Sequence, residues 1–578
     1  MAVTSNPKAD MRRDESDLSS THIDRCDPRQ EKSSSPEQIK VELTEADCYA
    51  ELGYSFSESK KWTIILVIFF VQTSMNFNTS LYSNALTGIS EEFNVSKQVG
   101  RCGAMIFLVL YAFGCELWAP WSEELGRKPI LQLSLLLVNI WQIPVGIAPN
   151  FATIMVGRAL GGICTAGGSV TLGMIADLWE AEDQQYAVAC VVFSSVGGSV
   201  LGPVVGGFVE AYLPWRWNIW IQLIFGVFVQ IAHLVLVPET RTTIMLDRIA
   251  KERRKNGEDV YGPNELISFK DRFSMKEILI TWIRPFRMFL TEPIVLTLSL
   301  LSGFTDALIF IFIQSFGLVY AQWDFGPVAL GLSFLPIMVG YVIAWIIAIP
   351  VIRRNVKERQ MKPNDERAQY ESRLWWLLYT ALCLPIGMIG FAWTSLPQCH
   401  WIGTMVFSAI IGIANFTIFM GTIDYMICAY GPYSASAAGG NGWSRDFLAG
   451  VLTVPATPFY ENIGGKYHLE YASTILFAIS VVLVITVYVI YWYGPVLRKR
   501  SPFAQQLIDA RAETHNRILE QHPEIPMGRS NQLARSQQSL RIRQTMGSRT
   551  GSFVGSRANS RVNSRVNSRA NSRRNSLS

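Results

Sequence analysis

Twelve stretches of apolar residues in the sequence are each long enough to cross a membrane as a helix. Such a crossing takes about twenty residues. Short polar or Gly/Pro-containing breaks separate the stretches, and charged residues make up only 17% of the chain, against about 25% in soluble domains. The stretches are 62–86, 100–119, 129–148, 152–176, 185–211, 217–237, 290–320, 326–352, 374–394, 401–426, 434–458 and 470–493. We therefore predict an all-α integral membrane protein with twelve transmembrane helices.

The longest polar interruption divides the predicted helices six and six. It covers residues 238–289 and contains eleven Lys or Arg residues. The loops on its side of the membrane carry about twenty basic residues, whereas the opposite loops carry only Lys97, Arg101, Arg216 and Lys466. Basic loops face the cytoplasm. We therefore expect two six-helix halves joined by a cytoplasmic central loop, with both termini in the cytoplasm.

Composition divides the chain into five parts. Residues 1–60 and 496–578 are polar, and we expect them to be disordered cytoplasmic tails. Residues 61–237 contain helices 1–6, residues 238–289 form the central loop, and residues 290–495 contain helices 7–12.

The C-terminal tail ends in a repeat in which an arginine stands three residues before a serine. The serines are Ser560, Ser564, Ser568, Ser572 and Ser576. Dense arginines are attracted to an anionic lipid surface, and this spacing suits a basic-directed kinase. We predict that phosphorylation releases the tail from the membrane. The alternative is a solvated low-complexity tail without this role.

One further modification site lies on the predicted outer side. Asn94, Val95 and Ser96 form an acceptor sequence for N-glycosylation. The sequence is close to the membrane, so the alternative is that Asn94 stays unmodified.

Several classes of protein are excluded by what the sequence lacks. It has no nucleotide-binding P-loop, so ATP-driven transport has no motor in this chain. We also find no catalytic triad setting and no zinc-ligand spacing, and most of the nine cysteines fall inside apolar stretches. We therefore expect no enzyme activity, cofactor, metal or nucleic-acid partner. The expected partners are a small-molecule substrate, protons and the lipid bilayer, and the expected state is a monomer.

Ionisable residues inside membrane helices are candidates for function, because burial there is costly. Arg158, Asp306, Arg445 and Asp446 qualify. Asp306 could take up and release a proton, or it could form a structural ion pair between helices. Arg445 and Asp446 point about 100° apart on a helix, which argues against a pair between them. Arg445 could instead hold a partner on another helix or contact substrate.

Polar residues among the apolar segments suggest a substrate cavity. Helix 1 carries Gln72, Asn76 and Thr79 at helical spacing, and such a stripe is expected to face a water-filled cavity. Helix 7 adds Phe310 and Gln314, and helix 11 adds Asn441 and Trp443. Together they suggest a cavity for amphipathic organic molecules. For each aromatic residue the alternative is ordinary core packing.

Helix 5 carries a glycine pattern suited to close helix packing. The residues are Gly198, Gly202, Pro203, Gly206 and Gly207, with three glycines at four-residue steps. Small residues let membrane helices approach closely, and the proline can bend the helix. The alternative is a tight interface with no further role.

The loop over residues 119–129 places Arg127 and Lys128 at a cytoplasmic helix end. There they can meet Glu123 and also Asp177, at the inner end of helix 4. The alternative is that these charges only fix topology.

Four motifs in order resemble those of the major facilitator superfamily. They are the loop 119–129, Arg158 with Gly162, the glycine pattern of helix 5, and Pro238-Glu239-Thr240 after helix 6. The resemblance covers residues 61–495 and is strongest to the fungal twelve-helix drug:proton antiporter branch, including multidrug and polyamine transporters. It implies that the loop cluster latches the inner ends of the two halves in one state and releases them in the other.

This resemblance implies a proton-coupled antiporter that exports drugs, toxins, secondary metabolites or polyamines by alternating access. The alternatives are a proton-coupled uptake permease for an organic nutrient or acid, and a membrane sensor that does not transport. We expect the plasma membrane rather than the vacuolar membrane.

Overall fold

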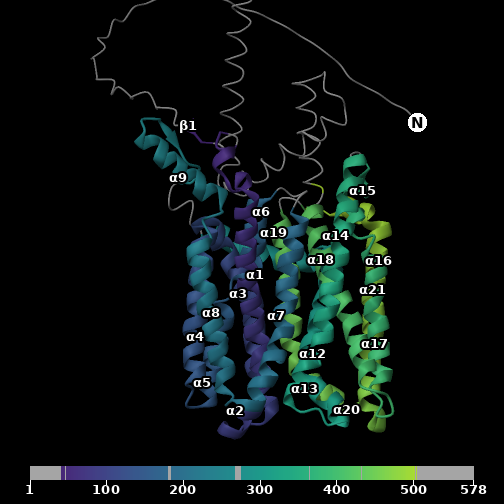
Figure 1. The fold of residues 1–578 in the computed structure, drawn as a ribbon. Coiled ribbons are helices and arrows are strands. Elements are labelled where there is room, and N and C mark those ends of the chain that lie inside the picture. The colour runs from purple at the N-terminus through teal and green to yellow at the C-terminus, as the bar shows by residue number, and fades with distance from the viewer. Residues whose placement is uncertain are drawn as a thin grey trace, which may run out of the picture. The chain divides into compact units, whose positions relative to one another are not determined.

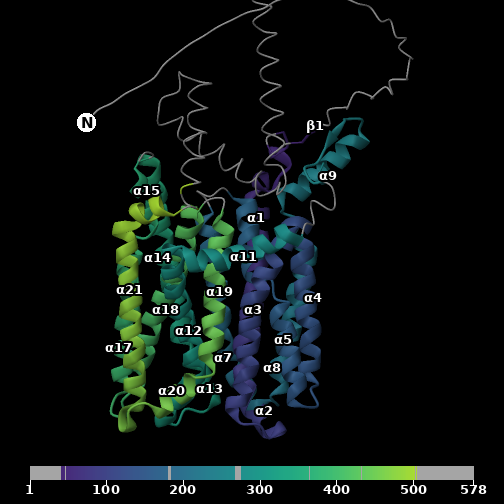
Figure 2. The same ribbon diagram turned by 180° about the vertical axis from the view of Figure 1, so that it is seen from behind.

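The computed structural model describes residues 41–43, 45, 47–179, 184–266, 275–362, 365–430, 433–501, 503 and 505. These residues are almost entirely helical, and the long helices run side by side as a bundle (Figures 1 and 2). The serines of the C-terminal repeat lie outside the described residues.

The first half of the bundle begins at Glu58, the first residue of α1. Its elements are α1 (Glu58–Leu81), η3 (Tyr82–Ala85), α2 (Leu86–Phe93), α3 (Lys97–Leu125), α4 (Arg127–Gly146), α5 (Phe151–Ile163), α6 (Gly167–Leu178), α7 (Gln185–Tyr212) and α8 (Arg216–Leu236). Ser96 begins α3 by accepting a hydrogen bond from the Val99 backbone, and Asn150 begins α5 in the same way.

The second half starts directly after a short helix, α11 (Met275–Thr291). Its elements are α12 (Pro293–Tyr320), η4 (Ala321–Trp323), α13 (Pro327–Leu332), α14 (Leu335–Met361), α15 (Glu366–Tyr370), η5 (Glu371–Arg373), α16 (Leu377–Thr380), α17 (Cys383–Thr394), α18 (Ile402–Tyr430), α19 (Ser434–Thr453), α20 (Ala456–Asn462), η7 (Gly465–Tyr467) and α21 (His468–Arg500).

Eleven helical segments of the described chain are long and apolar enough to cross a membrane. The prediction of twelve differs at α19, which covers most of the eleventh predicted segment. This helix contains Asn441, Arg445 and Asp446 among its glycines and serines. It packs against α3, α11, α12 and α18, so much of its surface faces protein. A helix enclosed in this way needs little apolar surface, and its composition therefore gives a weak signal.

Two predicted disordered or loop regions contain regular structure. Strand β1 (Val41–Glu42) pairs in parallel with β2 (Val260–Tyr261). Along the chain, β1 is followed by η1 (Tyr49–Glu51) and η2 (Gly53–Ser55). These elements pack with α9 (Thr242–Lys255) around the buried side chains Leu43, Cys48, Leu52, Tyr54, Leu246 and Ala250. The expectation of disorder up to residue 60 is therefore wrong from residue 41 onward, because this segment buries apolar side chains on the central segment.

The glycines of α7 allow close contact with two neighbouring helices. A Cβ atom added to Gly198 would lie 2.7 Å from the Thr73 backbone oxygen, and one on Gly202 would lie 2.7 Å from the Leu81 nitrogen, both on or beside α1. A Cβ on Gly207 would instead lie 2.6 Å from the Pro327 backbone oxygen, in the second half. The predicted close packing is present, and α7 uses it both within and between the halves.

Hydrogen bonds join the two halves at both ends of the bundle. We call the end that carries residues 119–129 the signature end. There Arg359 of α14 donates to the Gln185 side chain of α7 over 3.1 Å. At the opposite end, Arg101 of α3 donates to Gln314 of α12 over 3.0 Å.

We expect Gly202→Ala to lower the melting temperature of the purified protein, because the new methyl group meets the backbone of α1. Overpacking of this kind costs about 1–3 kcal/mol. Gly442→Ala in α19 is the matched control, since none of the residues that the structure describes lies within 4 Å of its added Cβ. Thermal denaturation followed by size-exclusion chromatography measures both. Equal melting temperatures for the two variants would contradict the role given to Gly202.

Candidate functional site

The signature end is organised around the carboxylate of Glu239, which follows α8. Its oxygens accept hydrogen bonds from the first two backbone N–H groups of α4, those of Arg127 at 2.9 Å and Lys128 at 3.2 Å. They also accept from the Thr240 backbone at 3.0 Å. An anionic group stabilises the positive end of a helix. Glu239 therefore fixes the start of α4 to the end of α8.

Gly126, which has no side chain, leaves room for the Glu239 carboxylate at the start of α4. Its φ of 106° is a backbone conformation that other residues rarely adopt. A Cβ atom there would also lie 2.5 Å from Oε2 of Glu239. Both requirements select glycine at this position of the loop.

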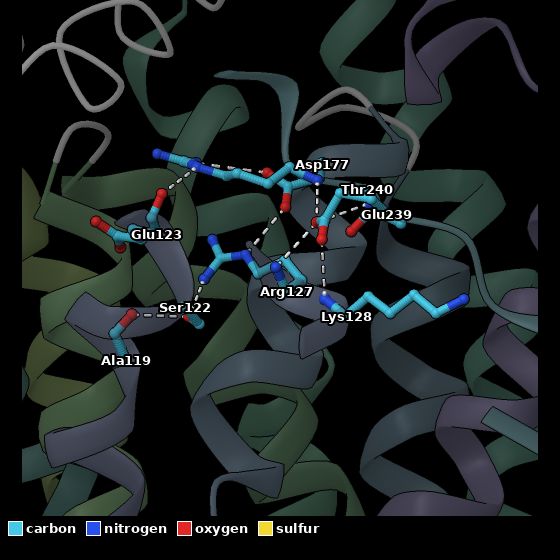
Figure 3. Close-up of polar contacts among 9 residues, drawn as sticks. Ala119, Ser122, Glu123, Arg127, Lys128, Asp177, Glu239 and Thr240 are labelled. Atoms are coloured by element: carbon cyan, nitrogen blue, oxygen red, sulfur yellow. Dashed lines mark hydrogen bonds and ion pairs between the residues drawn. The ribbon is translucent and has the colours of Figure 1, made fainter. Parts of the chain in front are cut away.

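Asp177, near the end of α6, lies between two arginines (Figure 3). Arg127 Nε donates to its Oδ2 over 3.0 Å, and Arg241 Nη1 is 3.6 Å from its Oδ1. Arg127 also donates to the Ser122 hydroxyl over 2.7 Å. All three charged side chains are buried. The predicted pairing of Arg127 with Asp177 is present in the structure.

The charge on Arg241 is retained despite its burial. Burial lowers the pKa of this guanidinium, but the charges of Asp177 and Glu123 outweigh the effect, so the pKa is higher than usual. Arg241 Nε also donates to the Glu123 backbone oxygen over 3.3 Å. Lys128 points elsewhere, since its Nζ donates to the Leu234 backbone over 3.0 Å. These contacts all lie in the first half, and a latch between the halves stays a prediction.

A second ionic cluster at the signature end does connect the halves. Asp424 of α18 pairs with Arg373 and accepts from Gln185 of α7. Arg498 of α21 pairs with Glu371 beside them in the second half. The sequence analysis does not predict this cluster, because its members come from four separate segments, α7, η5, α18 and α21.

Asp306 and Arg445 form a buried ion pair in the middle of the second half. Arg445 Nη2 is 3.1 Å from Oδ1 of Asp306, and each side chain is only 6% exposed. The Arg445 guanidinium also lies over the Phe419 ring of α18. Asp446 is buried on the same helix without joining this pair. The prediction that Arg445 holds a partner on another helix, and not Asp446, agrees with this geometry.

Arg158 of α5 is buried without a carboxylate partner among the described residues. It donates to Oδ1 of Asn78 over 2.9 Å and to the Gly103 backbone over 3.3 Å. Its guanidinium lies 4.1 Å from the ring centre of Phe107 and 4.5 Å from that of Tyr82. Its Nη2 makes no hydrogen bond. A buried cation held only by neutral groups is able to attract an anionic group or influence a nearby proton site.

The helix 1 candidates for the substrate cavity point toward α7. Gln72 and Asn76 each donate to the Ser195 hydroxyl over 3.4 Å. Thr79 donates to the Met75 backbone of its own helix over 3.2 Å. This polar stripe therefore contacts a neighbouring helix, which periodicity alone does not distinguish from a cavity.

The remaining cavity candidates lie where the halves meet or near it. Phe310 packs in a cluster with Phe107 and Tyr111 of α3. Gln314 accepts from Arg101 and donates to Ser83 over 3.0 Å. Phe310 and Gln314 of the second half therefore both contact side chains of the first half.

On α19, Asn441 accepts a hydrogen bond from Ser302 over 3.4 Å. Trp443 lies among aromatic rings of α3 and α11. Asn94, the predicted glycosylation site, is exposed in a left-handed conformation at the end of α2.

In the described chain, eleven helical segments could cross a membrane by length and composition, and buried polar residues lie where the two halves of the bundle meet. Residues 68–454 match the family model described as Major Facilitator Superfamily. The chain belongs to this superfamily, as the four sequence motifs predicted, and its members are transporters and not enzymes.

Fungal transporters are among its relatives. The MFS-type transporter acdC of Aspergillus candidus is 33% identical over 454 residues, which cover 77% of this chain and 87% of that one. The ascochitine biosynthesis cluster MFS transporter of Didymella fabae is 30% identical, with 78% and 86% covered. The matches therefore cover most of this chain and most of each relative.

Solved structures share the fold at low sequence identity. The human organic anion transporter MFSD10 (TETRAN) superposes with a TM-score of 0.51 at 15% identity, covering 74% of this chain and all of that one. The xylose transporter XylE from E. coli, in a partially occluded inward-open conformation, also gives a TM-score of 0.51, at 14% identity, with 75% and 98% covered.

We expect Gly126→Ala to destabilise the protein more than Gly257→Ala. Both glycines have a positive φ, 106° and 98°. In the described part of the chain, an added Cβ on Gly126 would meet Glu239, whereas one on Gly257 would have no atom within 4 Å. The conformational cost of about 1–3 kcal/mol is common to both. The difference between the melting temperatures of the two variants measures the effect of the contact with Glu239. A larger fall for Gly257→Ala than for Gly126→Ala would contradict this contact.

We expect Arg445→Met to lower the melting temperature more than Arg158→Met. The first variant leaves Asp306 buried without its partner, a loss of about 3–5 kcal/mol. The second removes a charge that has no carboxylate partner in the described chain. Adding Asp306→Asn to Arg445→Met should restore part of the loss, and a double-mutant cycle measures this coupling. Additive effects of the two substitutions would contradict a stabilising ion pair between Asp306 and Arg445.

Proposed function

We propose that this protein is a proton-coupled antiporter that exports amphipathic small molecules by alternating access. The observation that carries the proposal is the ion pair between Asp306 and Arg445, buried between α12 and α19. Protonation of Asp306 would remove the charge that holds Arg445, and deprotonation would restore it. Such a pair can couple proton uptake to a rearrangement of the two helices.

Two further features support export. The glycine pattern of α7 resembles that of the drug:proton antiporter branch, and Gly207 places α7 directly against α13 of the other half. One relative is named for a biosynthesis cluster. We infer that the substrate of this protein is also a product of small-molecule biosynthesis, with drugs, toxins and polyamines as further candidates.

The substrate site we propose lies between the halves near Phe310 and Gln314, with Trp443 and Asn441 on the α19 side. Phe310 and Gln314 each contact side chains of the first half. Aromatic and amide groups together suit molecules that are apolar over most of their surface but carry a polar group.

We place the signature end and both termini in the cytoplasm, on the basis of the positive loop charges. The plasma membrane is the proposed location, and Asn94 is then an outer glycosylation site. The protein acts as a monomer in this proposal. We also propose that the loop 119–129 acts in gating. A basic-directed kinase acting on the C-terminal serines is part of the same proposal.

The decisive experiment measures proton movement in reconstituted vesicles when candidate substrates are added. With wild-type protein we expect substrate movement in one direction to drive protons in the other. Asp306→Asn should abolish this proton movement, because an amide does not titrate. Asp324→Asn is the matched control, since Asp324 lies in the loop after η4, at the opposite end of the bundle.

The other outcomes identify the alternative functions. Proton movement in the same direction as substrate would make the protein an uptake permease. Substrate binding without movement of either would make it a sensor. Antiport that persists in Asp306→Asn would leave export in place but assign the proton to another residue.

A further inference from the structure

Helix α11 presents an apolar row on its exposed side. Leu279, Ile280 and Ile283 are 49%, 51% and 47% exposed, and Leu290 is 73% exposed. Ile283 lies four residues after Leu279 and three after Ile280, and Leu290 lies seven residues after Ile283, so the four residues lie on one side of the helix. An apolar row of this length in contact with water is unfavourable. The face is therefore expected to have an apolar environment in the working protein.

Two exposed basic residues lie on the same side of α11, Lys276 before the row and Arg287 between Ile283 and Leu290. Lys276 stands four residues before Ile280, and Arg287 stands four residues after Ile283. Both thus lie on the same face as the apolar side chains. Long basic side chains can extend past an apolar surface and hold their charge at its polar edge. Apolar residues bordered by Lys and Arg are typical of helices that lie on anionic membranes.

The position of α11 in the fold places it at a membrane surface. It ends at Thr291, and the spanning helix α12 begins two residues later at Pro293. In Figure 2, α11 lies at the signature end of the bundle. Most of α12 is buried within the bundle, but the row on α11 is exposed beside the end of this spanning helix. A bilayer with anionic head groups offers an apolar and an anionic partner side by side.

The other side of α11 contacts both halves of the transporter. Phe286 stacks on Phe113 of α3 with ring centres 5.8 Å apart, and meets Trp443 of α19 at 5.4 Å. Phe113 and Trp443 also contact each other directly, at 5.9 Å. Phe289 adds a contact to Trp443 at 5.3 Å. Because α3 belongs to the first half and α19 to the second, α11 covers the seam between them.

We propose that α11 binds anionic phospholipid head groups through Lys276 and Arg287, and that the bound lipid holds the seam between α3 and α19 closed at the signature end. The row of Leu279, Ile280 and Ile283 enters the edge of the hydrocarbon region. Phe286 transmits the position of α11 to both halves. This inference goes beyond transport itself and does not depend on its direction or on protons.

The binding step is tested with purified full-length protein and phosphatidylglycerol, by native mass spectrometry over a titration. Each basic residue near an anionic surface contributes about fivefold in affinity. Lys276→Gln with Arg287→Gln should thus weaken retention roughly 30-fold. The matched control is Arg248→Gln with Lys255→Gln, an equal change of charge at exposed positions of α9. Equal retention by the two double variants would overturn the proposal.

The closing step is tested by the distance between spin labels at Leu125 and Met361, exposed positions at the signature ends of α3 and α14. Vesicles with phosphatidylglycerol should increase the short-distance population of the wild type over vesicles of phosphatidylcholine alone. Phe286→Ala should retain the lipid but lose this dependence. A wild-type distance between the two labels that is the same in both kinds of vesicle would refute the closing step. Association of two copies of the protein through the exposed row of α11 would refute the proposal as a whole.

Discussion

The hydrocarbon core provides no water whose release could draw helices together, so membrane helices associate through close packing and internal polar contacts. The bundle satisfies this constraint mainly at glycines. Gly198 and Gly202 bring α7 against α1, and Gly207 brings the same helix against α13 of the other half. Helix α7 therefore contributes close packing both within the first half and between the halves. Its contact with α1 lies inside one half, whereas its contact with α13 lies between the halves.

The same constraint governs the charges. Asp177 lies between two arginines at the signature end, and Asp306 pairs with Arg445 in the interior, so each of these buried carboxylates has a partner of opposite sign. Arg158 departs from this rule within the described chain, since neutral acceptors and aromatic rings surround it. A buried charge without a partner is costly, and such a residue is a reasonable place to seek function rather than stability.

Sequence reasoning predicted the apolar segments and the family well, because both depend on composition and on local motifs. It also included residues 434–458 among the spanning segments, where α19 lies. This helix carries Arg445 and Asp446 and is less apolar than the eleven helical segments of the described chain that could cross a membrane by length and composition. The polar stripe of Gln72 and Asn76 is predicted to face a cavity, and in the structure both side chains donate hydrogen bonds to Ser195 of α7. Periodicity shows that a face is polar and does not show what it contacts.

The sequence by itself determined the membrane class, the division into two halves and the superfamily, because apolar length and motif spacing are properties of the chain alone. Only the tertiary structure decided which charges meet. Glu239 reaches the start of α4, and Gln185 reaches Asp424 of the other half, over separations of more than one hundred residues. Helix α11 was likewise not predicted, because most of it lies in the segment 238–289 that the sequence assigns to a loop. Such contacts depend on how helices are arranged around one another, and local sequence does not encode that arrangement in a readable form.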